Sequence, residues 1–281
     1  MRRRGRETTA FVLSGGASLG AMQAGMLHAL YERGIRPDLI VGTSAGALNG
    51  AFVASRPQTV ATAEELGAVW RGLRRGRLFP VDPFAGLLGL SGLRDHLVPE
   101  RGLRRIVESR LDVERLEETP IPLHVIATDV LTGEEVRLSE GPAADAVMAS
   151  AAIPGVLPAV EWEGRPLVDG GVANNAPVSH AVELGATRVY LLPTGYACDL
   201  EEPPRSALAM LVHATSVLTH YRMHADVRAL REMCDLVVLP PPCPLTVAPF
   251  DFSQARHLIE RALADAREFL DTPRATLPRA A

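Results

Sequence analysis

The sequence contains no lysine, and all 29 of its basic residues are arginines. This absence excludes chemistry that depends on lysine, namely Schiff bases, Ser-Lys dyads and the lysine of phosphate-binding loops. Aromatic residues are also few, at 5% of 281 residues. With 47% hydrophobic and 22% charged residues, the composition is nevertheless that of an ordinary globular protein, and the length suits one large domain.

Cysteine is scarce and irregularly spaced. Cys198, Cys234 and Cys243 form no Cys-x-x-Cys pair, and their number is odd. The pattern predicts neither a disulfide framework nor a thiolate zinc site, and it favours a reducing compartment.

Long apolar runs are missing as well. No stretch reaches the roughly 20 apolar residues of a membrane-spanning helix, and the arginine-rich start lacks the apolar segment of a signal peptide. A net charge of −4 and a pI of about 6.1 give no basic footprint for nucleic acid. We therefore expect a cytoplasmic protein that binds no nucleic acid and contacts a membrane at most peripherally.

Hydrophobic periodicity predicts strands alternating with helices along most of the chain. The expected strands cover residues 9–14, 39–41, 121–130, 134–138, 166–168, 188–192 and 236–239, and the expected helices cover 21–33, 47–54, 142–152, 176–184, 206–233 and 252–270. Such alternation is typical of an α/β fold with a parallel sheet, whose ligands bind beyond the carboxyl ends of the strands. We assign residues 1–8 to a basic tail, 9–271 to a single domain and 272–281 to a C-terminal tail.

Residues 71–97 differ from the rest in their weak periodicity and their high content of Gly, Pro, Leu and Phe. They begin with Arg71, Arg74, Arg75 and Arg77. We interpret the segment as an irregular insertion that forms a packed connecting loop. The alternative is a lid over a lipid site, flanked by arginines that contact anionic headgroups.

The strongest local motif is Gly42-Thr43-Ser44-Ala45-Gly46, a G-x-S-x-G between an expected strand and an expected helix. This is the context of a nucleophile elbow, in which small neighbours permit a sharp turn and the serine hydroxyl lies at the positive end of a helix. The motif predicts that Ser44 is a nucleophile, although a structural turn would have the same pattern.

A second glycine-rich turn, Gly15-Gly16-Ala17-Ser18-Leu19-Gly20, also joins a strand to a helix, so its amides can converge on an anion. A dinucleotide site would need a glycine at position 17 and an acidic residue after the next strand, where Gly42 stands. We therefore favour an oxyanion hole.

The base that activates Ser44 is less evident. His180, His213, His220, His224 and His257 could each complete a Ser-His-Asp triad, but none has a supporting context. Asp169 ends an expected strand and precedes Gly170 and Gly171, which allow a tight turn that exposes the carboxylate at the same sheet edge as Ser44. A carboxylate within hydrogen-bond reach can take the serine proton directly if its pKa is tuned.

Taken together, these motifs resemble the patatin-like phospholipase family. The resemblance rests on Leu13-Ser14-Gly15-Gly16 with Gly20 and Gly25, the Gly-Thr-Ser-Ala-Gly elbow, and Asp169-Gly170-Gly171 followed by Asn174-Asn175 and Pro177. The connecting segments Ala127-Thr128-Asp129 and Ala149-Ser150-Ala151-Ala152-Ile153-Pro154 also resemble the family, and the similarity extends over residues 9–195.

The resemblance implies a three-layer α/β/α domain with a mixed, mostly parallel sheet, and a Ser-Asp dyad that hydrolyses acyl esters of lipids without a metal or other cofactor. Ser44 would be the nucleophile, Asp169 the base, and the amides of Gly15, Gly16 and Ala17 the oxyanion hole, with that of Ala45 as a further donor. The motif would be supported by Gly20, Gly42, Gly46, Gly170 and Gly171. The chain departs from the family at Ala17 and Leu19, where a glycine and a basic residue are usual.

Two other functions remain open. The same acyl-enzyme could transfer its acyl group to an alcohol or carrier, and the departures at Ala17 and Leu19 would also suit a non-catalytic lipid-binding protein. A metal site on the face shared by His213, His220 and His224 is a weaker reading, because Tyr221 stands where a zincin motif needs glutamate. We interpret Asp129 as a structural turn residue.

Overall fold

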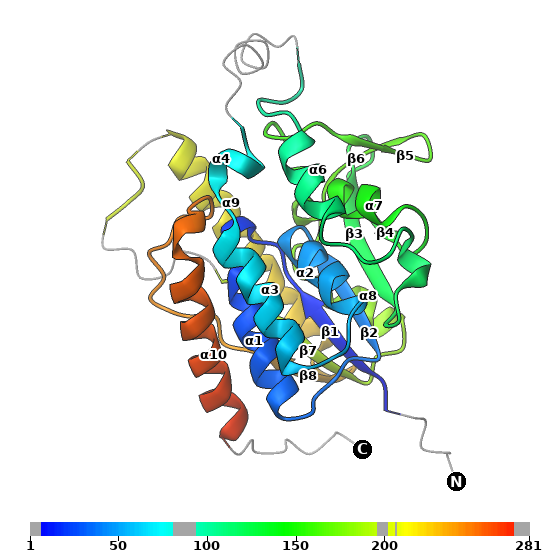
Figure 1. Ribbon diagram of the computed structural model, residues 1–281, viewed down its shortest axis with the longest axis vertical. Coiled ribbons are helices and arrows are strands. Elements are labelled where there is room, and N and C mark those ends of the chain that lie inside the picture. Colours follow the sequence, from blue (N-terminus) through cyan, green and yellow to red (C-terminus); the bar gives the residue numbers. More distant parts are fainter. Residues whose placement is uncertain (1–6, 81–93, 196–201, 206, 273–281) are drawn as a thin grey trace.

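The computed structural model describes residues 7–80, 94–195, 202–205 and 207–272 (Figure 1). In these residues one eight-stranded sheet forms the centre of the molecule, in the order β5, β6, β3, β2, β1, β7 and β8, with β4 paired to β3. The strands are β1 (Thr9–Leu13), β2 (Leu39–Thr43), β3 (Leu123–Asp129), β4 (Glu135–Leu138), β5 (Val160–Trp162), β6 (Arg165–Asp169), β7 (Arg188–Leu192) and β8 (Asp235–Val238).

The sheet is mixed and mostly parallel, as expected. β1 pairs in parallel with β2 and β7, β2 with β3, and β7 with β8. β4 and β6 are antiparallel to β3, and β5 is antiparallel to β6. The central strands β1 and β2 are almost wholly buried, which explains why they consist of continuous apolar and small residues.

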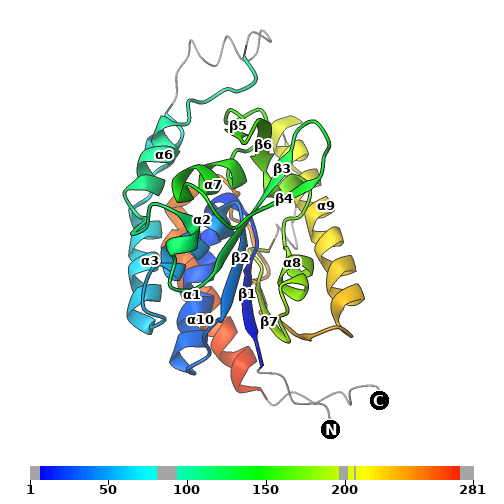
Figure 2. The ribbon, with the colours of Figure 1, turned by 90° about the vertical axis from the view of Figure 1, so that its right-hand side faces the viewer.

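Helices cover both faces of the sheet (Figure 2). On one face lie α1 (Ala21–Glu32), α2 (Ala45–Ala54), α3 (Val60–Gly72), α6 (Arg101–Glu108), α7 (Ala143–Ser150) and α10 (Ala255–Asp271); on the other lie α8 (Val178–Glu183) and α9 (Ala207–Leu230). The sheet separates two hydrophobic cores, and alternate side chains of a strand point into one or the other. Phe11 and Leu13 of β1 belong to the larger core, and Ala10 and Val12 belong to the smaller one. This is the expected three-layer α/β/α arrangement.

Shorter helical segments complete the fold. They are α4 (Arg75–Leu78) and the 3₁₀ turns η1 (Ala17–Gly20), η2 (Leu116–Glu118), η3 (Gly170–Val172) and η4 (Phe252–Gln254). Periodicity missed α3, α6 and β5. Thr59 caps the start of α3, because its hydroxyl accepts a hydrogen bond from the Thr62 amide at 3.4 Å.

The structure covers only part of residues 71–97, which the sequence predicts to be an irregular insertion. Within it the structure places the end of α3 and the short helix α4, whereas residues 81–93 lie outside the described residues. The expectations for the tails at 1–8 and 272–281 fall mostly outside them too.

Two findings concern cysteines and membranes. Cys243 is disulfide-bonded, which the cysteine pattern did not predict, whereas Cys234 is a free thiol. Among the described helices, none is both long enough and apolar enough to cross a bilayer.

Candidate active site

Ser44 occupies a sharp turn between β2 and α2. Its φ of 54° and ψ of −120° lie outside the regions that non-glycine residues favour, as in a nucleophile elbow. The flanking glycines permit the turn because a Cβ at Gly42 would lie 2.6 Å from the Gly46 carbonyl oxygen, and one at Gly46 would overlap the Leu13 carbonyl. The backbone at Ser44 therefore has the shape of an elbow, with Gly42 and Gly46 on either side.

Asp169 reaches Ser44 because β2 and β6 approach each other along the same edge of β3. Thr43 of β2 pairs with Ile126 of β3, and Asp169 of β6 pairs with the next residue, Ala127. The opposite edge of β3 at both positions is taken by β4. The strand ends therefore meet, and the Ser44 Oγ donates a hydrogen bond of 2.6 Å to Asp169 Oδ2 across 125 residues of sequence.

The Asp169 carboxylate is buried but hydrogen-bonded. Only 7% of the residue is exposed, and the Gly171 amide donates to its Oδ1 at 2.7 Å. Burial raises the pKa of Asp169 to about 6, against the opposing effect of the hydrogen bonds from Ser44 and Gly171. The carboxylate is therefore a stronger base than an ordinary aspartate, yet it still ionises below neutral pH.

The turn after Asp169 depends on close backbone packing. Gly170 is buried, and a Cβ on it would overlap the Ile126 carbonyl of β3. Thr128 donates from its hydroxyl to the Asp169 carbonyl at 3.0 Å. The two glycines predicted to support the motif thus allow the turn at Gly170 and supply the amide donor at Gly171.

Ser150 is a site residue to which the sequence assigned no role. The Ser44 amide donates to Ser150 Oγ at 2.8 Å, and Ser150 Oγ donates to the Ile126 carbonyl at 2.5 Å. This serine ends α7 and is wholly buried. It connects the elbow to the strand that also pairs with Asp169.

The glycine-rich loop lies beside Ser44, since a Cβ at Gly15 would be 3.0 Å from the Ser44 Cβ. Its amides are not equivalent. The Gly15 amide donates to the Asn175 carbonyl at 3.1 Å, so the expectation that Gly15 contributes a free oxyanion donor does not fit the structure. The amides of Gly16 and Ala17 have no hydrogen-bond partner among the described residues.

Ala17 adopts a φ of 50°, so a residue with a Cβ takes the left-handed conformation that glycine would adopt easily. Leu19 is 3% exposed and belongs to the larger core. The departure from the family's usual residue at position 19 therefore places an apolar side chain in the protein interior.

A chain of buried side chains holds the loop from behind. Gln23 donates to the carbonyls of Ser14 and Leu192, each at 2.9 Å. Asn49 donates to the Gly20 carbonyl at 2.9 Å and to Gln23 Oε1 at 2.7 Å, and Trp70 Nε1 donates to Asn49 Oδ1 at 2.8 Å. Gly20 itself packs closely, because a Cβ there would lie 2.7 Å from the Ala45 Cβ.

Comparison with known proteins agrees with this geometry. Residues 11–182, which contain both Ser44 and Asp169, match the description "patatin-like phospholipase". The chain belongs to the patatin-like phospholipase family. The resemblance seen in the motifs is thereby confirmed.

Relatives in the patatin-like family extend beyond this chain. An uncharacterized NTE family protein of Mycobacterium tuberculosis is 30% identical over 242 residues, which are 80% of this chain and 60% of that protein. Lysophospholipase NTE1 of Mycosarcoma maydis is 28% identical over 195 residues, or 67% of this chain and 10% of that protein. The chain thus spans less than two thirds of the length of either relative.

The fold is shared with a solved structure of low sequence identity. The crystal structure of VipD from Legionella pneumophila superimposes with a TM-score of 0.52 at 14% identity, over 94% of this chain and 67% of that chain. This likeness confirms the patatin-type fold.

Among the described residues, the other sequence candidates of this patatin-like chain form no hydrogen bond with the dyad. None of the hydrogen bonds of Ser44 within the described residues goes to a histidine. His220 and His224 lie with ring centroids 4.3 Å apart, but the described residues contain no group of three potential metal ligands. Asp129 accepts from the amides of Leu131 and Thr132 at 2.8 and 3.2 Å, which confirms its role as a turn residue.

Proposed function

We propose that this patatin-like chain hydrolyses acyl esters of lipids, with Ser44 as the nucleophile and Asp169 as the general base. The observation that carries the proposal is the 2.6 Å hydrogen bond from Ser44 Oγ to a buried carboxylate, at a strand-to-helix elbow inside the family-matched region. The Mycosarcoma relative is named a lysophospholipase, which supports phospholipid-type esters as the substrate class.

In the first half of the reaction, Asp169 accepts the hydroxyl proton as Ser44 Oγ bonds to the ester carbonyl carbon. The carbonyl oxygen becomes negatively charged, and the amides of Gly16 and Ala17 donate to it. The Ala45 amide is a third donor, since it begins α2 and has no intrahelical acceptor. The bond to the leaving alcohol then breaks, and the alcohol takes the proton from Asp169.

In the second half, water attacks the acyl-enzyme and gives one proton to Asp169, which is again the base. The same amides stabilise the second oxyanion. When the tetrahedral intermediate collapses, the proton returns to Ser44 Oγ and the fatty acid leaves. Every proton in this cycle moves between Asp169, Ser44 and the substrate or water, so the proposed reaction needs no metal or cofactor.

The test compares hydrolysis of a lysophospholipid and of p-nitrophenyl esters by the wild-type protein, Ser44→Ala and Asp169→Asn. We expect both variants to lose activity by about a thousandfold or more, as when a nucleophile or its base is removed from a serine hydrolase. A metal chelator in excess should leave the wild-type rate unchanged.

A covalent probe adds an independent readout. A fluorophosphonate should label the wild-type protein once, at Ser44 by mass spectrometry, and should not label Ser44→Ala. Full activity of Asp169→Asn would exclude the carboxylate as the base. Transfer of a labelled acyl group to glycerol faster than to water would make the protein an acyltransferase.

A further inference from the structure

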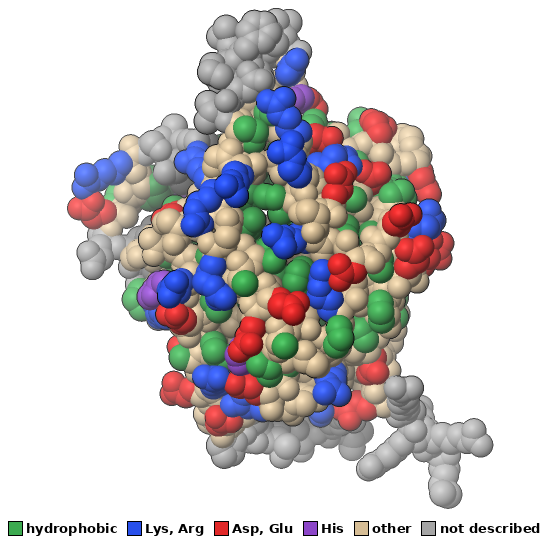
Figure 3. Space-filling view, in the orientation of Figure 1, with side chains coloured by type: hydrophobic (Ala, Val, Ile, Leu, Met, Phe, Trp, Pro, Cys, Tyr) green, Lys and Arg blue, Asp and Glu red, His purple; other side chains and the backbone are tan. Residues whose placement is uncertain are grey.

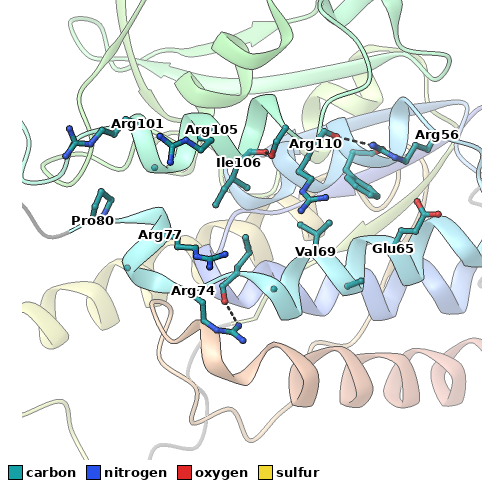
Figure 4. Close-up of a pocket in the computed structure, with 17 residues that line it drawn as sticks. Arg56, Glu65, Val69, Arg74, Arg77, Pro80, Arg101, Arg105, Ile106 and Arg110 are labelled. Atoms are coloured by element: carbon teal, nitrogen blue, oxygen red, sulfur yellow. Dashed lines mark hydrogen bonds between the residues drawn. The ribbon is translucent and has the colours of Figure 1, made fainter.

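A large groove with arginines along its walls lies away from the dyad, between α3 and α4 on one side and α6 on the other (Figure 4). Its volume is about 1120 Å³, and neither Ser44 nor Asp169 lines it. The groove begins at Phe52 and Arg56 near the end of α2 and extends to Arg77 and Arg101. It is therefore separate from the site at the start of α2.

The charge in this groove is strongly one-sided. Six arginines line it, Arg56, Arg74, Arg77, Arg101, Arg105 and Arg110, against one carboxylate, Glu65. Arg56 is paired with Asp112 at 2.7 Å. The other five have no carboxylate partner within the described part of the chain, and all five are exposed. Figure 3 shows basic side chains gathered over α4 and α6.

The carboxylates near α6 pair with Arg104, which does not line the groove. Arg104 forms ion pairs with Glu100, the residue before α6, at 3.0 Å, with Glu108 of α6 at 3.8 Å, and with Asp145 of α7 at 2.7 Å. Arg101 and Arg105, on the groove side, are left without these partners. Because all basic residues of the chain are arginines, the choice of arginine over lysine does not point to a ligand. The gathering of unpaired arginines in one groove does.

The floor of the groove is apolar. It consists of Phe52, Val69, Leu73 and Ile106, which are buried or half-buried, whereas the five unpaired arginines of the lining are exposed. These four residues also line a second, smaller hollow whose remaining walls are mostly leucines, among them Leu48, Leu66 and Leu103. The combination of a cationic rim and an apolar floor matches a ligand that has an anionic head and a hydrocarbon chain.

We propose that this groove binds the phosphate headgroup of an anionic phospholipid in a membrane surface, with hydrocarbon against the apolar floor. Guanidinium groups bind phosphate oxygens through paired hydrogen bonds, and basic residues near an anionic bilayer each add to binding. A nucleic acid would find no exposed aromatic ring to stack on within the groove lining, since Phe52 is 5% exposed. The proposal concerns membrane attachment, so it stands independently of the hydrolytic role of Ser44.

The test measures sedimentation of the protein with vesicles of phosphatidylcholine alone, or with one third phosphatidylglycerol. The Ser44→Ala protein is used so that the lipid is not consumed. Its variant Arg77→Gln/Arg101→Gln/Arg105→Gln removes three charges from the groove. The control Arg165→Gln/Arg228→Gln/Arg256→Gln removes three exposed arginines elsewhere that have no ion pair among the described residues, so the net charge of the two variants is equal.

We expect the parent protein and the control to prefer the anionic vesicles, and the groove variant to bind them at least about tenfold more weakly. High salt should weaken the binding of the parent, because exposed charges are screened. Millimolar glycerol phosphate should not displace the vesicles, since it lacks the hydrocarbon chain and the many headgroups of a surface.

Three results would overturn the proposal: equal binding to both kinds of vesicle, equal losses in the groove variant and its control, or displacement by glycerol phosphate. The last would assign the groove to a soluble phosphate ester. Matching circular dichroism melts of the two triple variants exclude unfolding as the cause. A failure of ester hydrolysis by the wild-type protein would leave all of these measurements interpretable.

Discussion

Asp169 is the residue whose environment makes the most direct prediction about activity. The proposed reaction needs the ionised carboxylate, and burial raises its pKa to about 6. The ratio kcat/KM should therefore rise tenfold per pH unit below that pKa and become constant above it. The measurement is a pH–rate profile on an ester with a leaving group that does not titrate. A profile that is flat from acid to neutral pH would exclude Asp169 as the base.

The carboxyl group of Asp169 also makes the free energy of unfolding depend on pH. The pKa of Asp169 rises from 3.8 to about 6 on folding, so the folded state holds its proton more tightly than the unfolded chain. The associated stability is present at acid pH and is lost as pH rises across this interval. Removing the charge of Asp169 should therefore stabilise the folded state most at neutral pH.

Asp169→Asn tests this effect. Relative to the wild type, its free energy of unfolding should increase between pH 4 and pH 7 by about 2–3 kcal/mol, since one pKa unit corresponds to about 1.4 kcal/mol. Chemical denaturation at the two pH values measures the difference. If the difference in unfolding free energy between variant and wild type does not change with pH, burial of the Asp169 charge does not destabilise the folded state.

At the scale of elements, the site depends on how α7 is joined to the elbow. In Ser150→Ala the Ser44 amide loses its acceptor in a buried place, which should cost about 1–3 kcal/mol in unfolding free energy. The loss should also misplace Ser44, so kcat should fall about tenfold or more while KM changes little. Steady-state kinetics and denaturation of the same protein sample measure both.

Ser55→Ala is the matched control for this change. Ser55 Oγ donates to carbonyls at the end of α2, at 3.1 and 3.2 Å, where the side chain is only partly buried. We expect its stability to stay within about 0.5 kcal/mol of the wild type and its kcat to be unchanged. Equal effects of the two serine substitutions would remove any special role from Ser150.

The elements that could be predicted from the sequence are those with a complete local signal. β1, α1, β2 and α2 combine apolar runs with glycine turns, and Gly34 ends α1 with a φ of 67°. In contrast, α6 is short, and most of its residues are charged or glycine. Its few apolar residues pack into a core shared with other helices, so they form no clear helical pattern in the sequence. β5 has three residues and is defined only by its pairing with β6.

The site shows the same division. Ser44 and Asp169 are in motifs that carry their own backbone requirements, so the sequence could indicate both as candidates, and the structure joins them by a hydrogen bond. The Gly15 amide is bonded to Asn175, which is 160 residues away, and this could not be deduced from local pattern. Nor could the hydrogen-bonded chain of Gln23, Asn49 and Trp70 be deduced, since Gln23 and Asn49 look locally like ordinary helix residues and the helix that contains Trp70 was not predicted.

At the scale of the whole molecule, the matched family region is not a complete folding unit. It ends at residue 182, yet β7 and β8 continue the sheet beside β1, and α10 packs on α1. A chain cut after residue 182 should therefore be insoluble or show no cooperative unfolding, because β1 loses a neighbour along all five residues. A truncated protein that melts like the whole chain would contradict this prediction.

Gly25 offers a finer test of the same packing. A Cβ at this position would overlap the Ile259 carbonyl of α10 and lie 2.8 Å from the Leu263 amide nitrogen. Gly25→Ala should push the two helices apart and destabilise the protein by about 1–3 kcal/mol, as overpacking does. Gly72→Ala is the control, because a Cβ at Gly72 would have no atom within 4 Å and should cause no overlap. The melting temperatures of the two variants measure the difference.

The meeting of β2 and β6 along one edge of β3 has a consequence for how the family can diversify. Thr43, which precedes Ser44, pairs with Ile126, and Asp169 pairs with Ala127, so two consecutive residues of a third strand position the dyad. The spacing of the dyad is then set by the sheet, and the chain between α2 and β3 supports the site mainly through Trp70 of α3. Among the described residues, α4 and α6 form no hydrogen bond with the dyad or the glycine-rich loop, so replacing these two helices should change the surface that a substrate meets while the dyad stays in place.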